Sequence, residues 1–333
     1  MLQNMTQETK RQHYVPEAYL NKFGFERKKD EYQVFVTLKD NLDKTFPVNT
    51  SKICVETNLY TLTGETEAKR QIIENFYDNN IEQNYNLVYE ILTNDKIREI
   101  TVIQKELIIS TAITLLFRVT KWLTSHYDFI ERVFEKALQV AKQFEQDNFI
   151  FHGEKIEING KNPKTLVGEY KKRINETNIL TQIEAAIKLI EIRKNDIICV
   201  IKIETENHSF VTSDNPIALF NFNSKMFAPF DPENVLSMPL NSKYRLIIYP
   251  NNELEESTFI TRVYHKNTLA YTEVLTNNLE QLDNSERFVI GDKQTINGLK
   301  SFLEEAQNNR QLGEINMKEL EKLIVRSKAM GII

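Results

Sequence analysis

The residue best placed for acid–base chemistry is His13, because it directly precedes a short helical pattern. Pro16 suits the first turn of a helix, and Gly24 is expected to end that helix in a left-handed conformation. Backbone N–H groups at a helix N-terminus bind anions and disfavour a charged imidazole. We therefore expect His13 to be a neutral base beside a phosphate or carboxylate group. The alternative is a histidine that packs against its own helix and bonds a backbone group.

Arg118 is the second candidate, since it is the only charged residue in the apolar run from Leu107 to Val119. A guanidinium in such a helix keeps its proton, so it must meet a carboxylate or a bound anion. On a helical projection of residues 73–92, Glu74 lies close to the apolar face and Glu82 lies further out. We expect Glu74 to be the half-buried partner of Arg118. A purely structural ion pair is the alternative.

The third candidate is Asp214, at the end of a strand pattern. Pro216 cannot donate to a strand ladder, so the strand must end before it and leave Asp214 and Asn215 at an exposed end. Scaffolds present reactive groups at such ends. We expect Asp214 to be an orienting carboxylate or a metal ligand, and Asn215 a polar contact. The alternative is an Asx-turn, in which Asp214 only bonds the backbone two residues on.

Three zones must position these residues. Residues 12–63 are rich in short strand patterns, residues 65–195 are helical, and residues 197–330 return to strands and then helices. We expect an α+β fold in which a mixed or antiparallel sheet, built from the N- and C-terminal zones, surrounds a central helical bundle. Residues 12–330 are expected to form a single domain, and two packed domains are the alternative.

Within these zones the patterns predict individual elements. A helix over residues 97–121 is apolar nearly all round, which predicts a central position. Separate helices are expected at residues 128–143, 166–173 and 181–193, with a surface hairpin at residues 149–162 between them. Residues 197–203 and 210–212 are expected to pair as strands across a polar turn.

Composition limits the partners and the location. The chain is 41% hydrophobic, which supplies a core and excludes a disordered protein. Its 42 basic and 47 acidic residues give 42 − 47 = −5, so any contact with nucleic acid or nucleotides must be a local patch. Two distant cysteines, Cys54 and Cys199, cannot build a disulfide framework, and no apolar run reaches the ~20 residues of a membrane span. We expect a cytoplasmic protein without membrane contact.

Two motifs give the chain a family resemblance. Residues 13–23 match His-Tyr-Val-Pro-x-x-Tyr-Leu-x-x-Phe, and residues 212–216 are Thr-Ser-Asp-Asn-Pro. With these motifs, the chain resembles the bacterial proteins of domain of unknown function 4238. Weaker matches are Asn58-Leu59-Tyr60, Pro239-Leu240, and an arginine on the central helix that fits Arg118. The resemblance spans residues 12 to about 288, and it implies a fold but no activity.

Our hypothesis is that His13, Arg118 and Asp214 converge in one polar pocket between the sheet and the central helix. The residues expected around them are Asn58, Glu74 and Asn215. A base, an anion clamp and a carboxylate suit hydrolysis of a phosphodiester in RNA, DNA or a nucleotide, with a divalent metal as an optional cofactor. Such a nuclease-like enzyme would suit bacterial defence or toxin systems. The alternative is a non-enzymatic binding or scaffold protein, in which the same residues form a structural network.

Overall fold

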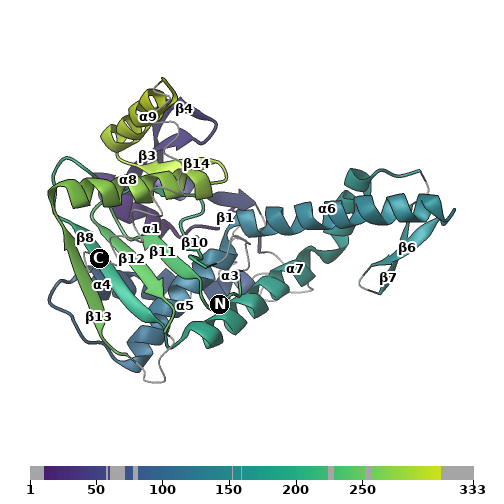
Figure 1. Ribbon diagram of the computed structural model, residues 1–333, viewed down its shortest axis with the longest axis horizontal. Coiled ribbons are helices and arrows are strands. Elements are labelled where there is room, and N and C mark those ends of the chain that lie inside the picture. The colour runs from purple at the N-terminus through teal and green to yellow at the C-terminus, as the bar shows by residue number, and fades with distance from the viewer. Residues whose placement is uncertain are drawn as a thin grey trace, which may run out of the picture.

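The molecule has a body of sheets and helices, from which a long helical arm projects (Figure 1). The computed structural model describes residues 11–57, 59–60, 72–77, 82–151, 153–158, 160–223, 229–251 and 257–308. Helices and mostly antiparallel strands occur together, so the expected α+β fold is confirmed.

One sheet of the body joins the two ends of the chain, as the sequence predicts. Its strands lie in the order β2 (Phe25–Lys28), β3 (Glu31–Leu38), β14 (Phe288–Gly291) and β9 (Thr212–Ser213), with β4 (Asn41–Asn49) also paired to β3. All of these pairs are antiparallel. A separate short ladder joins β1 (Arg11–His13) to β5 (Val55–Thr57) and sets His13 opposite Val55.

The second sheet comes entirely from the C-terminal zone. Its strands lie in the order β10 (Ala218–Phe220), β11 (Val235–Pro239), β12 (Tyr244–Tyr249), β8 (Ile197–Ile203) and β13 (Ile260–His265). Only the β8–β13 pair is parallel. The expected pairing of residues 197–203 with 210–212 is wrong, because β12 and β13 occupy both edges of β8.

The helices of the body are α1 (Glu17–Leu20), α3 (Ile72–Tyr77), α4 (Gln83–Thr93), α5 (Val102–Arg118), α8 (Asn267–Asn284) and α9 (Lys293–Asn308), with short 3₁₀ helices η1 (Asn21–Phe23) and η2 (Thr50–Lys52). The continuous helix expected over residues 97–121 is shorter than predicted. Thr101 starts α5 through a reciprocal capping box with Gln104, and Val119 adopts an extended conformation that ends it.

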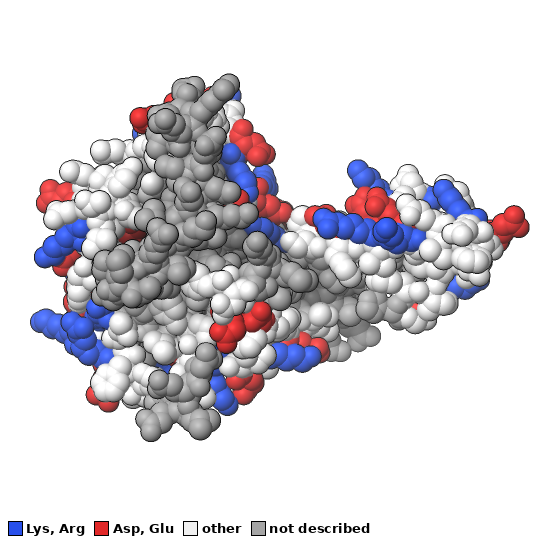
Figure 2. Space-filling view, in the orientation of Figure 1, with Lys and Arg blue, Asp and Glu red and all other residues white. Residues whose placement is uncertain are grey.

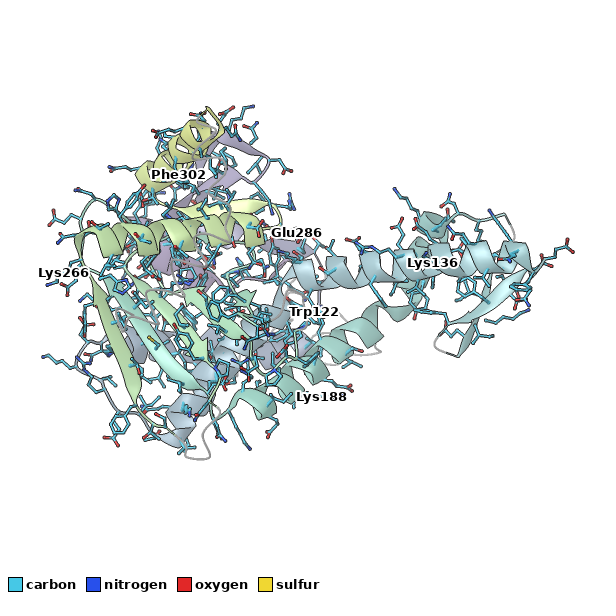
Figure 3. All side chains as sticks on the ribbon, viewed as in Figure 1. Trp122, Lys136, Lys188, Lys266, Glu286 and Phe302 are labelled. Atoms are coloured by element: carbon cyan, nitrogen blue, oxygen red, sulfur yellow. The ribbon has the colours of Figure 1, made fainter. Side chains whose placement is uncertain are left out.

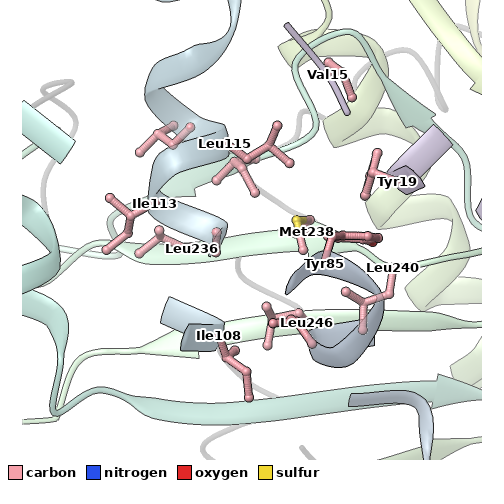
Figure 4. Close-up of a cluster of buried hydrophobic side chains, with 14 of the residues drawn as sticks. Val15, Tyr19, Tyr85, Ile108, Ile113, Leu115, Leu236, Met238, Leu240 and Leu246 are labelled. Carbon is pink, nitrogen blue, oxygen red and sulfur yellow. The ribbon is translucent and has the colours of Figure 1, made fainter. Parts of the chain in front are cut away.

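Helix α5 is central, as its all-round apolar pattern predicts. Buried side chains occur at nearly every position from Ile108 to Arg118. They pack between α4 and the inner face of the second sheet, where Leu236, Met238 and Leu246 point toward them (Figure 4). A helix buried on all sides cannot move without exposing apolar surface on several neighbours, so α5 fixes the position of the residue at its end, Arg118.

The arm is formed by α6 (Thr120–Gln143), the first part of α7 (Pro163–Arg193) and the hairpin of β6 (Asn148–Phe151) and β7 (Glu154–Glu157), while the second part of α7 packs in the body core. The hairpin appears where it was predicted, whereas the two helices expected at residues 166–173 and 181–193 are one continuous α7. The arm has a small core of its own around Phe134, whose ring contacts those of Phe149 and Tyr170. It is therefore stabilised by its own packing as well as by its attachment to the body.

Gly24 has a different role from the one expected. Its φ is −99°, which is ordinary extended backbone, so the predicted left-handed cap is wrong. A Cβ atom at this position would lie 2.7 Å from the backbone oxygen of Gln33 in β3. The glycine is therefore needed because two backbone segments approach closely here.

We predict that Gly24→Ala lowers the melting temperature by several degrees, since overpacking against backbone costs on the order of 1–3 kcal/mol. Gly168→Ala is the matched control, because nothing lies within 4 Å of a Cβ atom there and α7 would gain helix propensity. Thermal unfolding of both variants by circular dichroism provides the measurement. Equal shifts in the two variants would contradict the close-approach argument.

Candidate functional site

His13 lies in strand β1 rather than at a helix N-terminus. Helix α1 has only four residues, and its first residue, Glu17, is four positions further along the chain. The half-buried imidazole places Nε2 3.3 Å from the carbonyl oxygen of Thr50. Burial lowers the pKa of His13, and the bond to Thr50 and the charge of Glu17 offset part of that effect. Burial, rather than the helix dipole assumed from the sequence, therefore favours the neutral form of His13.

Arg118 meets a carboxylate, as its place in an apolar helix requires. Its Nη2 atom lies 2.6 Å from Oε1 of Glu82 and donates to the backbone oxygen of His13 at 2.6 Å. The guanidinium is 3% exposed and lies over the rings of Tyr77, at 4.7 Å, and Tyr60, at 5.6 Å. Its Nε and Nη1 atoms have no hydrogen-bond partner in the described part of the chain. The positive charge of Arg118 is therefore paired with Glu82, whereas two of its N–H donor atoms have no partner among the described residues.

Glu74 is not the ion-pair partner of Arg118, so that expectation is wrong. The helical projection placed Glu74 nearer the apolar face than Glu82, whereas the structure pairs Arg118 with Glu82, which lies directly before α4. Glu74 is buried and accepts a hydrogen bond of 2.7 Å from Nε2 of Gln12, the neighbour of His13. It therefore lies in the same region as His13 but supports the β1 segment. Asn58, another expected contact, lies outside the described residues.

Asp214 is buried, and main-chain donors engage both of its carboxylate oxygens. Oδ1 accepts from the N–H of Glu286, and Oδ2 accepts from the N–H groups of Arg287 and Phe288, at 2.8–3.1 Å. Burial raises the pKa of Asp214, while these three bonds hold it down in part. The carboxylate, only 2% exposed, thus fixes the turn that leads into β14 and is not displayed at an exposed strand end.

Asn215 belongs to a set of amide contacts between helix α8 and residues 209–217. Its Nδ2 atom donates to the backbone oxygen of Asn284, and Asn284 donates back to the oxygens of Asn215 and Ile217. Three more α8 amides bond the same segment; they are Asn277, Asn278 and Gln281. Because β9 is only two residues long, these side chains provide the backbone partners that a longer strand would obtain from its neighbours.

The two sequence motifs meet in one buried contact. The hydroxyl of Tyr19 lies 2.6 Å from Oγ1 of Thr212 and donates to the backbone oxygen of Pro239 at 2.9 Å. Both side chains are fully buried. Both motifs thus have a role in packing, because one tyrosine ties the N-terminal segment to two strands of the C-terminal zone.

The structure brings the expected site residues into two groups. Around the imidazole of His13 lie Thr50, Glu17, Glu82 and Arg118. Asp214 instead lies beside the next residue, Tyr14, and the thiol of Cys54. Burial raises the pKa of both Tyr14 and Cys54, which keeps the two groups neutral. His13 and Arg118 therefore share a site, and Asp214 belongs to a neighbouring buried one.

The Asp214 turn is also held from the arm. Oε2 of Glu286 accepts from Thr120, Oε1 accepts from Thr124, and Lys121 donates to the backbone oxygen of Asn284. Figure 3 shows Glu286 where the end of α8 meets the start of α6. The base of the arm is thus attached to the same turn that Asp214 fixes.

A second buried charged cluster, between α8 and the second sheet, was missed by the sequence reasoning. Arg245 of β12 bonds Glu273, Glu280 and Ser237, and it is 3% exposed. His265 is equally buried, with Nδ1 3.8 Å from a Glu273 oxygen and no hydrogen-bond partner in the described residues. The signal that could have found the cluster is the one used for Arg118, a lone charge within the apolar strand 244–249.

Neither cluster offers a metal site. Among the described residues, no group of three His, Cys, Asp or Glu side chains is arranged to hold a metal ion. A shallow cavity of about 400 Å³ lies elsewhere, at the start of α8, and is lined by residues that include His208 and Tyr271. No helix in the described ranges has the length and apolar character needed to cross a membrane.

The Arg245 cluster predicts a pH dependence of stability. Burial raises the pKa of Glu280 to about 7, with Glu273 adding to the effect and Arg245 opposing it, because one guanidinium faces two carboxylates. The folded state then holds more protons than the unfolded state between pH 4.5, the ordinary pKa of Glu280, and about pH 7. The stability from this group is complete below that window and is lost as the pH rises through it.

We therefore expect Glu280→Gln to flatten the decline of melting temperature between pH 4.5 and 7, and to be no less stable than the wild type at pH 8. Differential scanning fluorimetry across this pH range measures the difference. The exposed Glu106→Gln variant is the control and is expected to keep the wild-type slope. An unchanged slope in Glu280→Gln would disprove the assignment.

Comparison with known proteins agrees with the motifs. No curated protein and no solved structure matches the chain. A family model described as "Protein of unknown function (DUF4238)" matches residues 11–295, which include both motifs, Arg118 and the second buried cluster. Since this match covers most of the 333 residues, the chain belongs to the DUF4238 family.

Proposed function

We propose that the chain is a non-enzymatic binding or scaffold protein, whose motif residues form a structural network. The observation that supports this most directly is the carboxylate of Asp214, which accepts three main-chain hydrogen bonds while only 2% exposed. A carboxylate used as a base or a metal ligand needs an oxygen that reaches the reacting group. Here both oxygens are engaged in holding the chain.

The same argument extends to the other motif residues. Asn215 is bonded to Asn284 in both directions, and Tyr19 joins Thr212 to Pro239. These contacts tie residues far apart in sequence into one unit, and buried polar networks of this kind favour a unique packing when every member is bonded. In the proposed role, the body is a rigid support, and the projecting arm is free to meet a partner (Figure 1).

This proposal predicts that Asp214→Asn lowers the melting temperature by on the order of 5 °C, because an amide offers one acceptor where three N–H donors converge. Asp283→Asn is the matched control, since Asp283 is exposed and lies on the same stretch of chain. Thermal unfolding of the two variants is compared with that of the wild type. If Asp214→Asn melts like the wild type, the carboxylate has no structural role and the proposal loses its main support.

The second candidate is the phosphodiester hydrolase, now restricted to His13 and Arg118. Two observations favour it: a half-buried imidazole with a lowered pKa, and a buried guanidinium with two donors that lack partners in the described chain. In this role, His13 would accept a proton from the attacking oxygen, and the buried donors of Arg118 would have to become accessible on substrate binding to stabilise negative charge on the phosphoryl group.

For this candidate, we expect His13→Ala to lower the rate of phosphodiester cleavage by about 10²–10⁴-fold with little change in melting temperature. The assay incubates the protein with RNA, single-stranded DNA and nucleotides, in Mg²⁺, Mn²⁺ or EDTA. His208→Ala, on the body surface, is the control and should retain full activity. Absence of cleavage by the wild type, or equal cleavage by His13→Ala, would reject the candidate.

A further inference from the structure

Helix α6 presents an apolar strip that the rest of the described chain leaves uncovered. Phe129 and Val140 lie on the helix and Phe144 directly follows it, and their exposed fractions are 61%, 55% and 65%. At about 100° per residue, the three positions fall within roughly 60° of one another on the helix. The strip is about 22 Å long at ~1.5 Å per residue, or four helical turns.

The strip is distinct from the face that builds the arm. Ile130, Phe134 and Leu138 of α6 are buried against α7 and the hairpin. The helix is thus apolar over a wide arc, and α7 covers only part of it. A single exposed apolar residue is common on protein surfaces and needs no explanation. Several large apolar side chains in a row on a projecting helix are instead typical of a helix-docking surface.

Two basic residues lie along the strip. Arg132 and Lys136 are exposed, fall between Phe129 and Val140, and form no ion pair with the part of the chain that the structure describes. Figure 3 shows Lys136 on α6 midway along the arm, and Figure 2 shows basic side chains in blue over this helix. The acidic neighbours Asp128 and Glu135 lie further round the helix, so the strip itself is apolar and positive.

We propose that this strip docks an amphipathic helix with acidic residues beside its apolar face, supplied by a partner protein. This inference names the partner class for the binding role proposed above, and therefore rests on it. A helix laid along α6 would bury the three apolar side chains and place carboxylates opposite Arg132 and Lys136. It would form the third helix of a bundle with α6 and α7.

Two other occupants fit the strip less well. In a symmetric antiparallel pair of α6 helices, the midpoint of the strip falls beside Lys136, so each Lys136 would face its equivalent in the second copy. A nucleic acid would need a basic field, whereas residues 120–193 contain 12 basic and 11 acidic residues. The charge on the strip favours a helix of opposite sign.

The test uses the full chain and two synthetic 18-residue amphipathic helices with leucine along one face. One peptide has glutamate beside the leucine face, and the other has lysine at the same positions. We expect the acidic peptide to bind at least tenfold more tightly, by fluorescence anisotropy, and its affinity to fall as salt rises. Equal affinity for the two peptides, or no binding, would overturn the proposal.

Variants of the chain locate the binding. Replacing Phe129, Val140 and Phe144 by serine is expected to weaken binding of the acidic peptide at least tenfold. Arg132→Glu with Lys136→Glu is expected to reverse the preference between the peptides. The control is Ile103→Ser, which removes a 76% exposed side chain from the body and should bind like the wild type. Unaltered binding by the serine variant would show that the strip is not the site.

Sedimentation velocity tests the remaining alternative, in which the strip binds a second copy of this chain. A concentration-dependent dimer that the serine variant abolishes would assign the strip to a second copy of the chain and overturn the proposal. A monomer at all concentrations is the expected result. Because all the substituted side chains are exposed, the variants should have the melting temperature of the wild type. Failure of docking is therefore distinguishable from failure of the Asp214 network, which is measured by unfolding.

Discussion

The pairing of buried backbone groups at residues 209–217 is the constraint on which the rest of the body depends. This segment passes between two sheets, yet it contributes only two residues to a regular strand. Its remaining polar groups would be left unpaired in the interior, at a cost of about 1–3 kcal/mol each. Amide side chains of α8 bond these groups, and Asp214 bonds the backbone of the turn after α8. Helix and segment therefore require each other.

That constraint gives the family motifs a physical meaning. In the Thr-Ser-Asp-Asn-Pro segment, an apolar side chain at Asp214 would remove the acceptor of three main-chain N–H groups, and one at Asn215 would remove a donor to the backbone oxygen of Asn284. The first motif reaches the same region through Tyr19, whose hydroxyl meets Thr212. Short polar motifs are often assigned to catalysis, but a network that joins distant segments places equally strict demands on residue type.

The position of Arg118 depends on a different physical effect, the cost of burying an unpaired charge. The helix that carries it is buried on all sides, so its charge has to be neutralised where the helix ends. Glu82 provides the charge, His13 provides a carbonyl, and two tyrosine rings cover the guanidinium. The sequence indicates that a carboxylate or a bound anion must be there. It does not indicate which one, because a helical projection ranks Glu74 above Glu82, whereas tertiary packing pairs Glu74 with Gln12 and leaves Glu82 for Arg118.

By itself, the sequence determined the α+β class, the sheet shared by the two ends, the central place of residues 107–119 and the need for a charge partner at Arg118. These features follow from local periodicity and from the cost of burying a charge, which act wherever the segment lies. The tertiary structure decided the partner of each group: Glu82 for Arg118, backbone amides for Asp214, and β14 rather than β8 for β9. Long-range packing decides these partners, because several residues distant in sequence could satisfy the same group equally well. Only the complete fold brings one of them into contact.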